Sequence, residues 1–457
     1  MRNYLKNIVF IVLVSFGLVL FFAYGNCEEN KASKTIWLSL KEAVALAFMN
    51  NKDIQFQEMG LDVSKANILG ARSQFIPKLK LDTGYRHNGT VLPIPSLGAK
   101  KDPGIYAGYE NDNTLNLILQ ESIYSGGANT ANLKQAQLNL KVQLETLRSV
   151  RLDVEFETKR LYFGLLLAYE TERIAQDLVN QAESHYEDTK KKFSQGTTSK
   201  FDVLQSKVQV SKVLPELIKA QNAVYLIEAQ LKKLLGIKID DSIKLKDTLA
   251  YSLLEINEGE FLRQAYLNKP EMILKSLGVD ISKWAIQTAK ASHRPQVNAD
   301  ASYDYRSNDL ADMFNQQHNN WHAGIYVTIP IFDGFSSKAK VDEAKAKYAQ
   351  ANLDKENLSD QIAVDIRRGC LDLGQAKAII DSSKDSIEEA KEALRISQVR
   401  FDYGEGTNLE ILDSQVSLSQ IEQNYSQAVY DYLMAGAYLD RTMGKDFLRE
   451  AKNEKKE

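Results

Sequence analysis

The side chains best suited to chemistry in this sequence are two carboxylates, each of which follows a glycine turn that occurs twice. The first copy of the turn lies in residues 193–206 and the second in residues 401–414, at a constant offset of 208 residues. Asp202 and Glu410 hold the same place in the two copies. A carboxylate there attracts cations by its charge, and at the start of a helix it also complements the positive end of the helix dipole. The duplication therefore predicts a molecule with two similarly built acidic turns.

No other cluster of side chains predicts a reaction or a metal centre. His318 and His322 are four residues apart, but the sequence offers them no clear carboxylate or cysteine partner, so we expect no metal. No glycine-rich phosphate loop follows a strand, and no nucleophile is matched with a base, so we expect neither a cofactor nor an enzyme. The net charge of −3 gives no reason to expect a nucleic-acid partner.

Each turn is predicted to join two helices. Gly196 and Gly404 suit the left-handed backbone conformation that follows the end of a helix. Hydroxyl side chains just after the glycines, such as that of Thr407, can accept hydrogen bonds from the free backbone N–H groups of a new helix. We name the expected turns the first tip (residues 194–199) and the second tip (residues 402–407).

Very long helices are expected to lead to the tips. Residues 128–193 and 335–401 have helical periodicity without a proline, and each helix would be about 100 Å long at 1.5 Å per residue. Residues 199–235 and 407–443 would return from the tips. In the second copy, apolar residues recur every seven positions beside a parallel row of small residues, as in knobs-into-holes packing. The apolar row consists of Ile366, Leu373, Ile380, Ile387, Leu394 and Phe401.

Four segments instead alternate apolar and polar residues, which predicts β-strands. They lie at about residues 77–87, 114–124, 295–305 and 321–332, and each has the length of a tilted transmembrane strand, about 9–11 residues. Four strands cannot close a barrel, and open sheet edges are not tolerated in lipid. If the strands span a membrane, several copies of the chain must therefore share one barrel, and three copies would give twelve strands. The alternative is a small soluble sheet packed against the helices.

The order of the segments indicates two structural repeats between a targeting segment and a charged tail. Arg2 and Lys6 precede an apolar run that ends in small residues, as in a secretory signal peptide. Cys27 would lie next to the cleavage point, which leaves lipidation open as an alternative. One helix is expected to open each repeat, at residues 38–75 and 259–292. The expected division is a signal peptide (1–25), a first repeat (26–235), a linker (236–257), a second repeat (258–443) and a charged tail (444–457).

This repeated order of helix, two strands, long helix, tip and helix resembles the TolC family of outer-membrane efflux proteins. The tip motif Phe-x-x-Gly, followed after five residues by an acid, an aliphatic residue and Leu, begins at Phe193 and at Phe401. The resemblance covers nearly the whole chain after the signal peptide. It implies a mainly α-helical homotrimer in which a twelve-stranded β-barrel in outer-membrane lipid continues into a twelve-helix α-barrel in the periplasm. It also implies a passive export channel that docks to a periplasmic adaptor, or membrane fusion protein, and to an inner-membrane transporter.

The resemblance assigns roles to residues only at the tips. Carboxylates after the second tip ring the periplasmic entrance in this family, and Glu410 and Asp413 match those places. Asp202 matches Glu410 in the first copy, where Gln205 stands at the place of Asp413. A ring of such groups would attract cations and repel anions. Candidates for adaptor contact are the tip residues Gly196, Thr197, Gly404 and Glu405.

A periplasmic coiled-coil adaptor, anchored through a lipid on Cys27, is the second interpretation of the sequence. Adaptors also contain helical hairpins that end in tips. They lack four amphipathic strands of membrane length, so the strands favour the channel.

Overall fold

The computed structural model describes most of the chain after the targeting segment. The described residues are 35–89, 93–94, 105–106, 109–309, 311 and 319–445. The signal peptide, Cys27, His318 and the tail beyond residue 445 lie outside them, so the expectations about those parts stay predictions.

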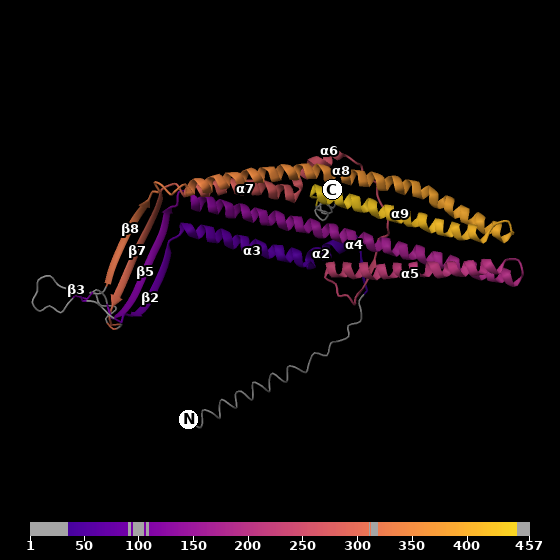
Figure 1. Cartoon of the computed structure of the whole chain (residues 1–457), viewed down its shortest axis with the longest axis horizontal. Helices are drawn as coiled ribbons and strands as arrows, with labels where there is room; N and C mark the ends of the chain where they lie inside the picture. Colours follow the sequence, from indigo (N-terminus) through magenta and orange to yellow (C-terminus); the bar gives the residue numbers. More distant parts are fainter. Residues whose placement is uncertain are drawn as a thin grey trace, which may run out of the picture.

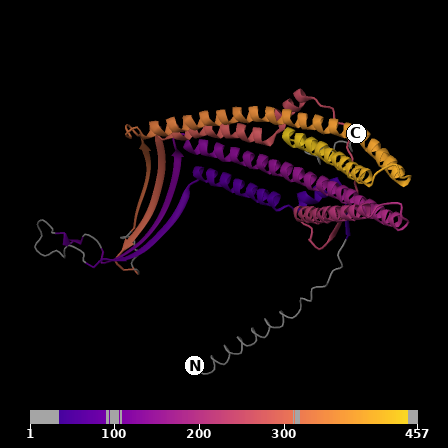
Figure 2. The same cartoon turned by 45° about the vertical axis from the view of Figure 1, so that its right-hand side comes forward.

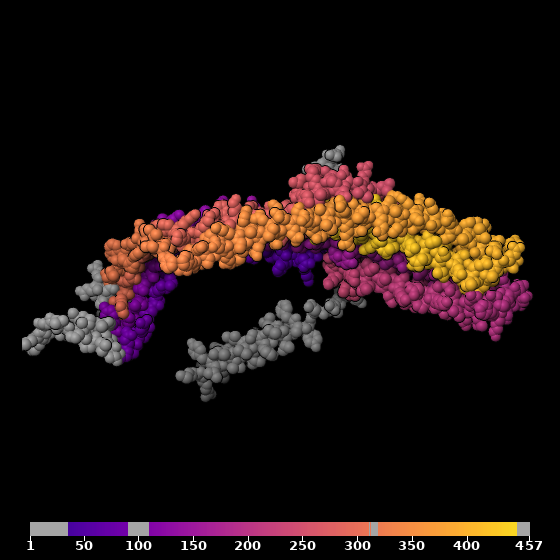
Figure 3. All heavy atoms as spheres, turned by 45° about the horizontal axis from the view of Figure 1, so that its top comes forward, coloured from indigo at the N-terminus to yellow at the C-terminus, as the bar shows by residue number. Residues whose placement is uncertain are grey.

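The molecule is long, narrow and gently curved (Figure 1). In both ribbon views four strands lie at one end of the molecule and the two tips lie at the other, and long helices connect the two ends (Figures 1 and 2). The space-filling view shows the same curved outline (Figure 3). The acidic turns at the tips are therefore far from the sheet.

A four-stranded antiparallel sheet in the order β2-β5-β7-β8 forms one end of the molecule. Its strands are β2 (Lys78–His87), β5 (Asn111–Tyr124), β7 (Gln296–Ser307) and β8 (Asn319–Thr328). The pairing of β5 with β7 joins the two halves of the chain in one sheet. Within the described residues, β2 and β8 each pair on one side only, so the sheet has two open edges.

The register of the sheet places like side chains in rows. Leu81, Leu117, Tyr303 and Trp321 form one row across the four strands, and the neighbouring row is polar. The expected alternation of faces is therefore present. The fourth strand, β8, ends at Thr328 and not at the expected residue 332. Thr328 pairs with Gln296, the first residue of β7, so no residue of β7 remains to pair with a longer β8. In the stretch expected to be a loop, β3 (Pro93–Ile94) and β4 (Ile105–Tyr106) form a short antiparallel pair.

Two helical hairpins extend from the sheet to the tips. The first consists of α4 (Ala128–Ser194) and α5 (Lys200–Leu235), and the second of α8 (Ser336–Asp402) and α9 (Asn408–Met443). The two long helices have 67 residues each, and the two returning helices have 36 each. In α8, the heptad residues Ile366, Leu373 and Ile380 are fully buried.

The single helices expected at residues 38–75 and 259–292 are each broken in two, so that part of the prediction is wrong. The first consists of α2 (Leu40–Asn50) and α3 (Lys52–Arg72), followed by a short 3-10 turn, η1 (Ser73–Phe75). Asn51 lies at the break and its side chain accepts hydrogen bonds from the first N–H groups of α3. The second consists of α6 (Glu258–Asn268) and α7 (Pro270–Ala291). Its break precedes a proline, which disfavours the helical conformation of the residue before it.

The linker contains a strand that the sequence did not predict. This strand, β6 (Ser242–Leu245), pairs in parallel with β1 (Thr35–Leu38), about two hundred residues earlier. The hydroxyl group of Tyr162, on α4, donates hydrogen bonds to the Leu38 carbonyl oxygen (3.1 Å) and to the Asp247 carboxylate (2.7 Å). The two-stranded sheet is thereby fixed to the long helix.

Two main hydrophobic cores lie in separate halves of the chain. One contains α2, α3, α4, α5, β1 and β6, and the other contains α6, α8 and α9. Charged side chains connect the halves. Arg441 of α9 contacts Asp153 of α4 (2.5 Å) and Glu271 of α7 (3.4 Å). Lys159 of α4 is buried between its ion-pair partner on the same helix, Glu155 (2.7 Å), and Asp440 of α9 (3.8 Å).

Candidate functional site

Both tips are closed by hydrogen bonds around a glycine with a left-handed backbone. Gly196 has φ 75° and Gly404 has φ 77°. After the first, the backbone N–H of Thr197 donates to the Lys192 carbonyl (3.0 Å), and after the second, Glu405 N–H donates to that of Arg400 (2.8 Å). A positive φ strains any residue with a side chain. The glycines are therefore needed for the turns, whatever else the tips contact.

The carboxylate of Asp202 is used by its own turn. It accepts hydrogen bonds from the Ser199 hydroxyl (2.6 Å), the Ser199 N–H (3.1 Å) and the Thr198 hydroxyl (2.9 Å), and Ser199 in turn caps α5. Burial alone would raise the pKa of Asp202, but these hydrogen bonds together outweigh it and hold the pKa below its ordinary value. Asp202 is thus an ionised capping residue.

Glu410 forms an ion pair with a residue of the preceding helix, α8. The Arg400 guanidinium lies 3.2 Å from its carboxylate and also donates to the Glu405 carbonyl oxygen (3.1 Å). The N–H of Glu410 is capped by the Thr407 hydroxyl (3.2 Å). Within one chain the charge of Glu410 is therefore largely balanced.

Asp413 differs from both of these carboxylates. Its side chain is exposed, and among the described residues it takes part in no hydrogen bond or ion pair. It lines a groove between α5 and α9, together with Gln205, its counterpart in the first copy. Of the three predicted acids, Asp413 is the one whose charge is available to an ion from solution.

A buried polar junction, which the sequence did not predict, connects the two hairpins just above the tips. The amide oxygen of Asn408 lies 2.6 Å from Nε2 of His185 on α4 and accepts a hydrogen bond from the Ser206 hydroxyl on α5 (3.1 Å). The amide nitrogen of Asn408 donates to the Gln205 side chain (3.0 Å). From the sequence, Asn408 was predicted only to lie at the start of a helix. Its hydrogen-bond partners could not be predicted because they are about two hundred residues away in the chain.

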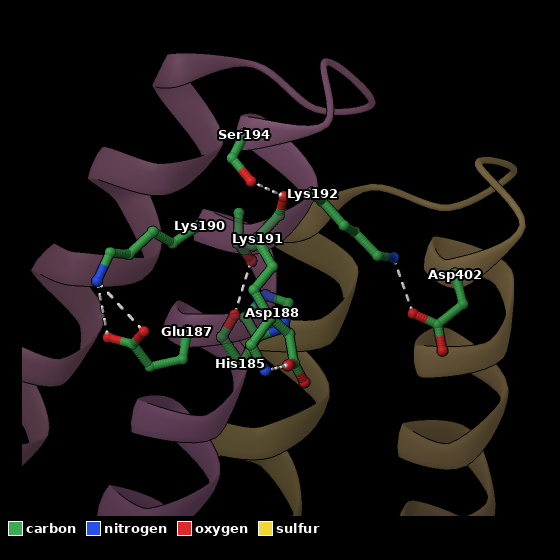
Figure 4. A network of polar contacts seen from close by, with 9 residues as sticks. His185, Glu187, Asp188, Lys190, Lys191, Lys192, Ser194 and Asp402 are labelled. Atoms are coloured by element: carbon green, nitrogen blue, oxygen red, sulfur yellow. Dashed lines mark hydrogen bonds and ion pairs between the residues drawn. The ribbon is translucent and has the colours of Figure 1, made fainter.

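His185 and Lys192 extend this connection towards the second tip. The His185 ring packs edge-on against the Phe401 ring, with centroids 5.5 Å apart. Lys192 forms an ion pair with Asp402 (2.8 Å), and its ammonium lies 4.3 Å from the centre of the Phe401 ring. Figure 4 shows Lys192 reaching from the first hairpin to Asp402 on the second. Burial, the largest effect on His185, lowers its pKa.

His322 has carboxylate partners, contrary to the expectation from the sequence. Its Nε2 lies 3.0 Å from Asp300 and its Nδ1 lies 3.0 Å from the Ser302 hydroxyl, all on the polar face of the sheet. Both ring nitrogens are therefore engaged. In the part of the chain that the structure describes, no group of three or more His, Cys, Asp or Glu is placed to hold a metal ion.

None of the described helices has both the length and the apolar content needed to cross a membrane.

Comparison with known proteins now identifies the family. The model of the outer membrane efflux protein family matches residues 43–237 and 261–445, which together are most of the chain. The chain belongs to the outer membrane efflux protein family. It is 21% identical to the outer membrane protein TolC of Vibrio cholerae over 418 residues, which cover 90% of this chain and 92% of that protein.

Solved structures of outer-membrane proteins share the fold. VceC of Vibrio cholerae superposes with a TM-score of 0.77 at 18% identity, over 89% of this chain and 96% of that one. The CmeC channel of Campylobacter jejuni superposes with a TM-score of 0.76 at 19% identity, over 91% of this chain and 89% of that one. The chain is therefore an outer-membrane export channel with a periplasmic helical extension, and the interpretation as a coiled-coil adaptor is excluded.

Proposed function

We propose that three copies of this chain, each built from the repeats 26–235 and 258–443 joined by the linker 236–257, form one passive export channel. The two open edges of the sheet support this proposal, since an edge exposed to lipid leaves backbone groups unpaired. Leu79, Leu81 and Tyr85 on β2 are largely exposed in the single chain, as expected of a face that contacts lipid. Three sheets joined edge to edge would give the twelve strands of a barrel.

The tips would form the periplasmic entrance of this channel and receive its partners. Gly196, Thr197, Gly404 and Glu405 lie at the turns, at the end farthest from the sheet, where a periplasmic adaptor could reach them. Energy would come from an inner-membrane transporter, because the sequence contains no phosphate-binding loop.

The entrance would prefer cations. The observation that carries this proposal is the carboxylate of Asp413, which has no hydrogen-bond or ion-pair partner within the described residues. Three copies would place three Asp413 side chains around one axis. Asp202 and Glu410 contribute less, because the first is hydrogen-bonded within its turn and the second is paired with Arg400. This ranking is sharper than the one from the sequence, which treated Glu410 and Asp413 alike.

Single-channel recording in planar lipid bilayers tests the ranking. Asp413→Asn should reduce the preference for potassium over chloride and raise the half-blocking concentration of a trivalent cation about tenfold, since three charges are removed from one ring. Glu410→Gln should change the block less than about twofold. Arg400→Gln should lower the half-blocking concentration, because it exposes the charge of Glu410.

An unchanged block in Asp413→Asn would refute the role of this carboxylate. A particle with the mass of a single chain after extraction from the outer membrane in mild detergent would refute the shared barrel.

A further inference from the structure

An apolar groove of about 410 Å³ lies between α5 and α9 directly behind the tips. Figure 3 shows α9 in yellow next to α5 in magenta at this end of the molecule. Its apolar walls are formed by Phe201, Leu204 and Val208 of α5 and by Leu409, Leu412 and Val416 of α9.

The groove is lined by equivalent positions of the two repeats. Phe201 corresponds to Leu409, Leu204 to Leu412 and Val208 to Val416, each at the offset of 208 residues. The only pair of these equivalents that differs in charge is Gln205 and Asp413, which lies in the middle of the groove. The duplication thus provides two similar apolar walls, and only one of them carries a carboxylate.

These apolar walls face water in the single chain. Phe201 is 70% exposed and Val416 is 46% exposed, and only Leu412 of the six is buried. A contiguous apolar patch at a functional end of a protein commonly marks a binding surface. Asp413, whose carboxylate has no partner in the part of the chain that the structure describes, lies within the same groove. A complementary ligand must therefore combine apolar surface with positive charge.

We propose that this groove binds organic cations that have an apolar body, with the body between the walls and the charge at Asp413. The inference rests on the proposed function, since it takes Asp413 to face the channel axis. Lys212, the one cationic side chain among the described residues that line the groove, follows Gln205 by seven residues along α5. Seven residues span about 10 Å of helix, which is about one Debye length at physiological salt. At that separation salt reduces its repulsion of a ligand at Asp413 to roughly a third of the unscreened value.

Charge also argues against the competing occupant, a helix of a second copy. A helix packed into the groove would take Asp413 out of water, and an ionised carboxylate is costly to bury unless it is paired. An organic cation supplies the pairing charge and the apolar surface together. Simple inorganic cations supply only the charge.

The test compares tetraphenylphosphonium with tetramethylammonium, two monovalent cations that differ in apolar surface. The half-blocking concentration of each is measured in bilayers containing the full-length channel, and binding is measured by equilibrium dialysis in detergent. The half-blocking concentration of tetraphenylphosphonium should be at least about tenfold lower than that of tetramethylammonium. A factor of ten corresponds to roughly 55 Å² of apolar surface removed from water at ~25 cal/mol per Å².

Variants separate the two contributions. Val208→Thr combined with Val416→Thr keeps the shape of the walls but makes them polar. This variant should raise the half-blocking concentration of tetraphenylphosphonium about fivefold and leave that of tetramethylammonium unchanged. Val399→Thr is the matched control, because Val399 is similarly exposed (42%) but lies outside the groove on α8. Asp413→Asn should raise the half-blocking concentrations of both cations, and Glu410→Gln should change either one less than about twofold.

Equal affinities for the two cations, or a weakening by Val399→Thr as large as that by the groove variant, would overturn the inference. If a trivalent cation still blocks the channel in that case, the cation-attracting entrance stands and only the apolar groove is refuted. If no cation blocks the channel and Asp413→Asn changes nothing, the proposed entrance itself fails.

Discussion

At the scale of residues, three carboxylates near the tips look alike in sequence and differ in their neighbours. Asp202 is held by Ser199 and Thr198, Glu410 faces Arg400, and Asp413 has no such partner among the described residues. The availability of a charge to solution is set by these contacts rather than by the type of residue. The sequence alone therefore predicts three acids near the tips, but it does not distinguish them by their contacts.

The buried junction at His185 should make the tips sensitive to acid. The pKa of His185 lies below its usual value of about 6.5, chiefly because burial disfavours the imidazolium. Its charged neighbours are Asp188 and Lys192 on α4, Asp202 on α5 and Asp402 on α8, while α9 presents the neutral Asn408. An exposed imidazole gains a proton near pH 6.5 and the buried one does not. The stability from this junction is thus complete above about pH 6.5 and is lost as the pH falls towards the depressed pKa.

We therefore expect the amide protection factors of residues 180–195 to fall between pH 7.5 and pH 5.5, as measured by hydrogen exchange. His185→Gln keeps a hydrogen-bonding side chain but cannot take up a proton in this range, so its protection factors should change less. An equal decrease in both proteins would show that another group is responsible.

At the scale of elements, the sequence predicts what local rules determine. The tips end and begin at the expected residues because glycine and capping side chains act within a few positions. The breaks at Asn51 and Lys269 were missed because a helical pattern of apolar residues continues on both sides of each. The pairing of β1 with β6 was missed because both strands are short and far apart in the chain.

The buried ion pair of Lys159 should be important for the packing of α4. Lys159 and Glu155 are 5% and 3% exposed, and Lys159→Met would remove the ammonium that lies 2.7 Å from the buried carboxylate. Removing one partner of a buried pair costs about 3–5 kcal/mol. We expect the temperature at which the helical circular dichroism is lost to fall by several degrees.

Two further variants serve as controls for this prediction. Lys190→Met removes an exposed ion pair with Glu187 and should cost less than about 0.5 kcal/mol. Lys159→Met combined with Glu155→Leu removes both charges and should recover much of the lost stability. A double variant no more stable than Lys159→Met would show that packing, rather than charge, is responsible.

At the scale of the whole molecule, one chain leaves large apolar surfaces uncovered. Phe56, Met59 and Val63 of α3 are between 61% and 74% exposed and lie on one face of that helix. An exposed apolar surface of this kind commonly marks the site of a neighbouring protein. In the proposed trimer that neighbour is the next copy.

Charges placed on this face should disrupt the assembly. Met59→Glu combined with Val63→Glu leaves the described core intact, because both side chains are exposed in the single chain. We expect the variant to lose the trimeric mass that light scattering in detergent should find for the unaltered protein. Lys65→Gln, on another face of the same helix, should leave the mass unchanged, and a stable trimer in the double variant would place the interface elsewhere.

The equal lengths of the matched helices limit how this protein can evolve. Each long helix has 67 residues and each returning helix has 36, so the two turns lie at the same distance from the sheet. An insertion of seven residues in one long helix would move its turn by about 10 Å and leave the other behind. Changes of length are therefore tolerated only when both long helices change together with the helices packed beside the altered stretch. A relative adapted to a wider or narrower periplasm should carry insertions or deletions of equal size in both halves of its gene.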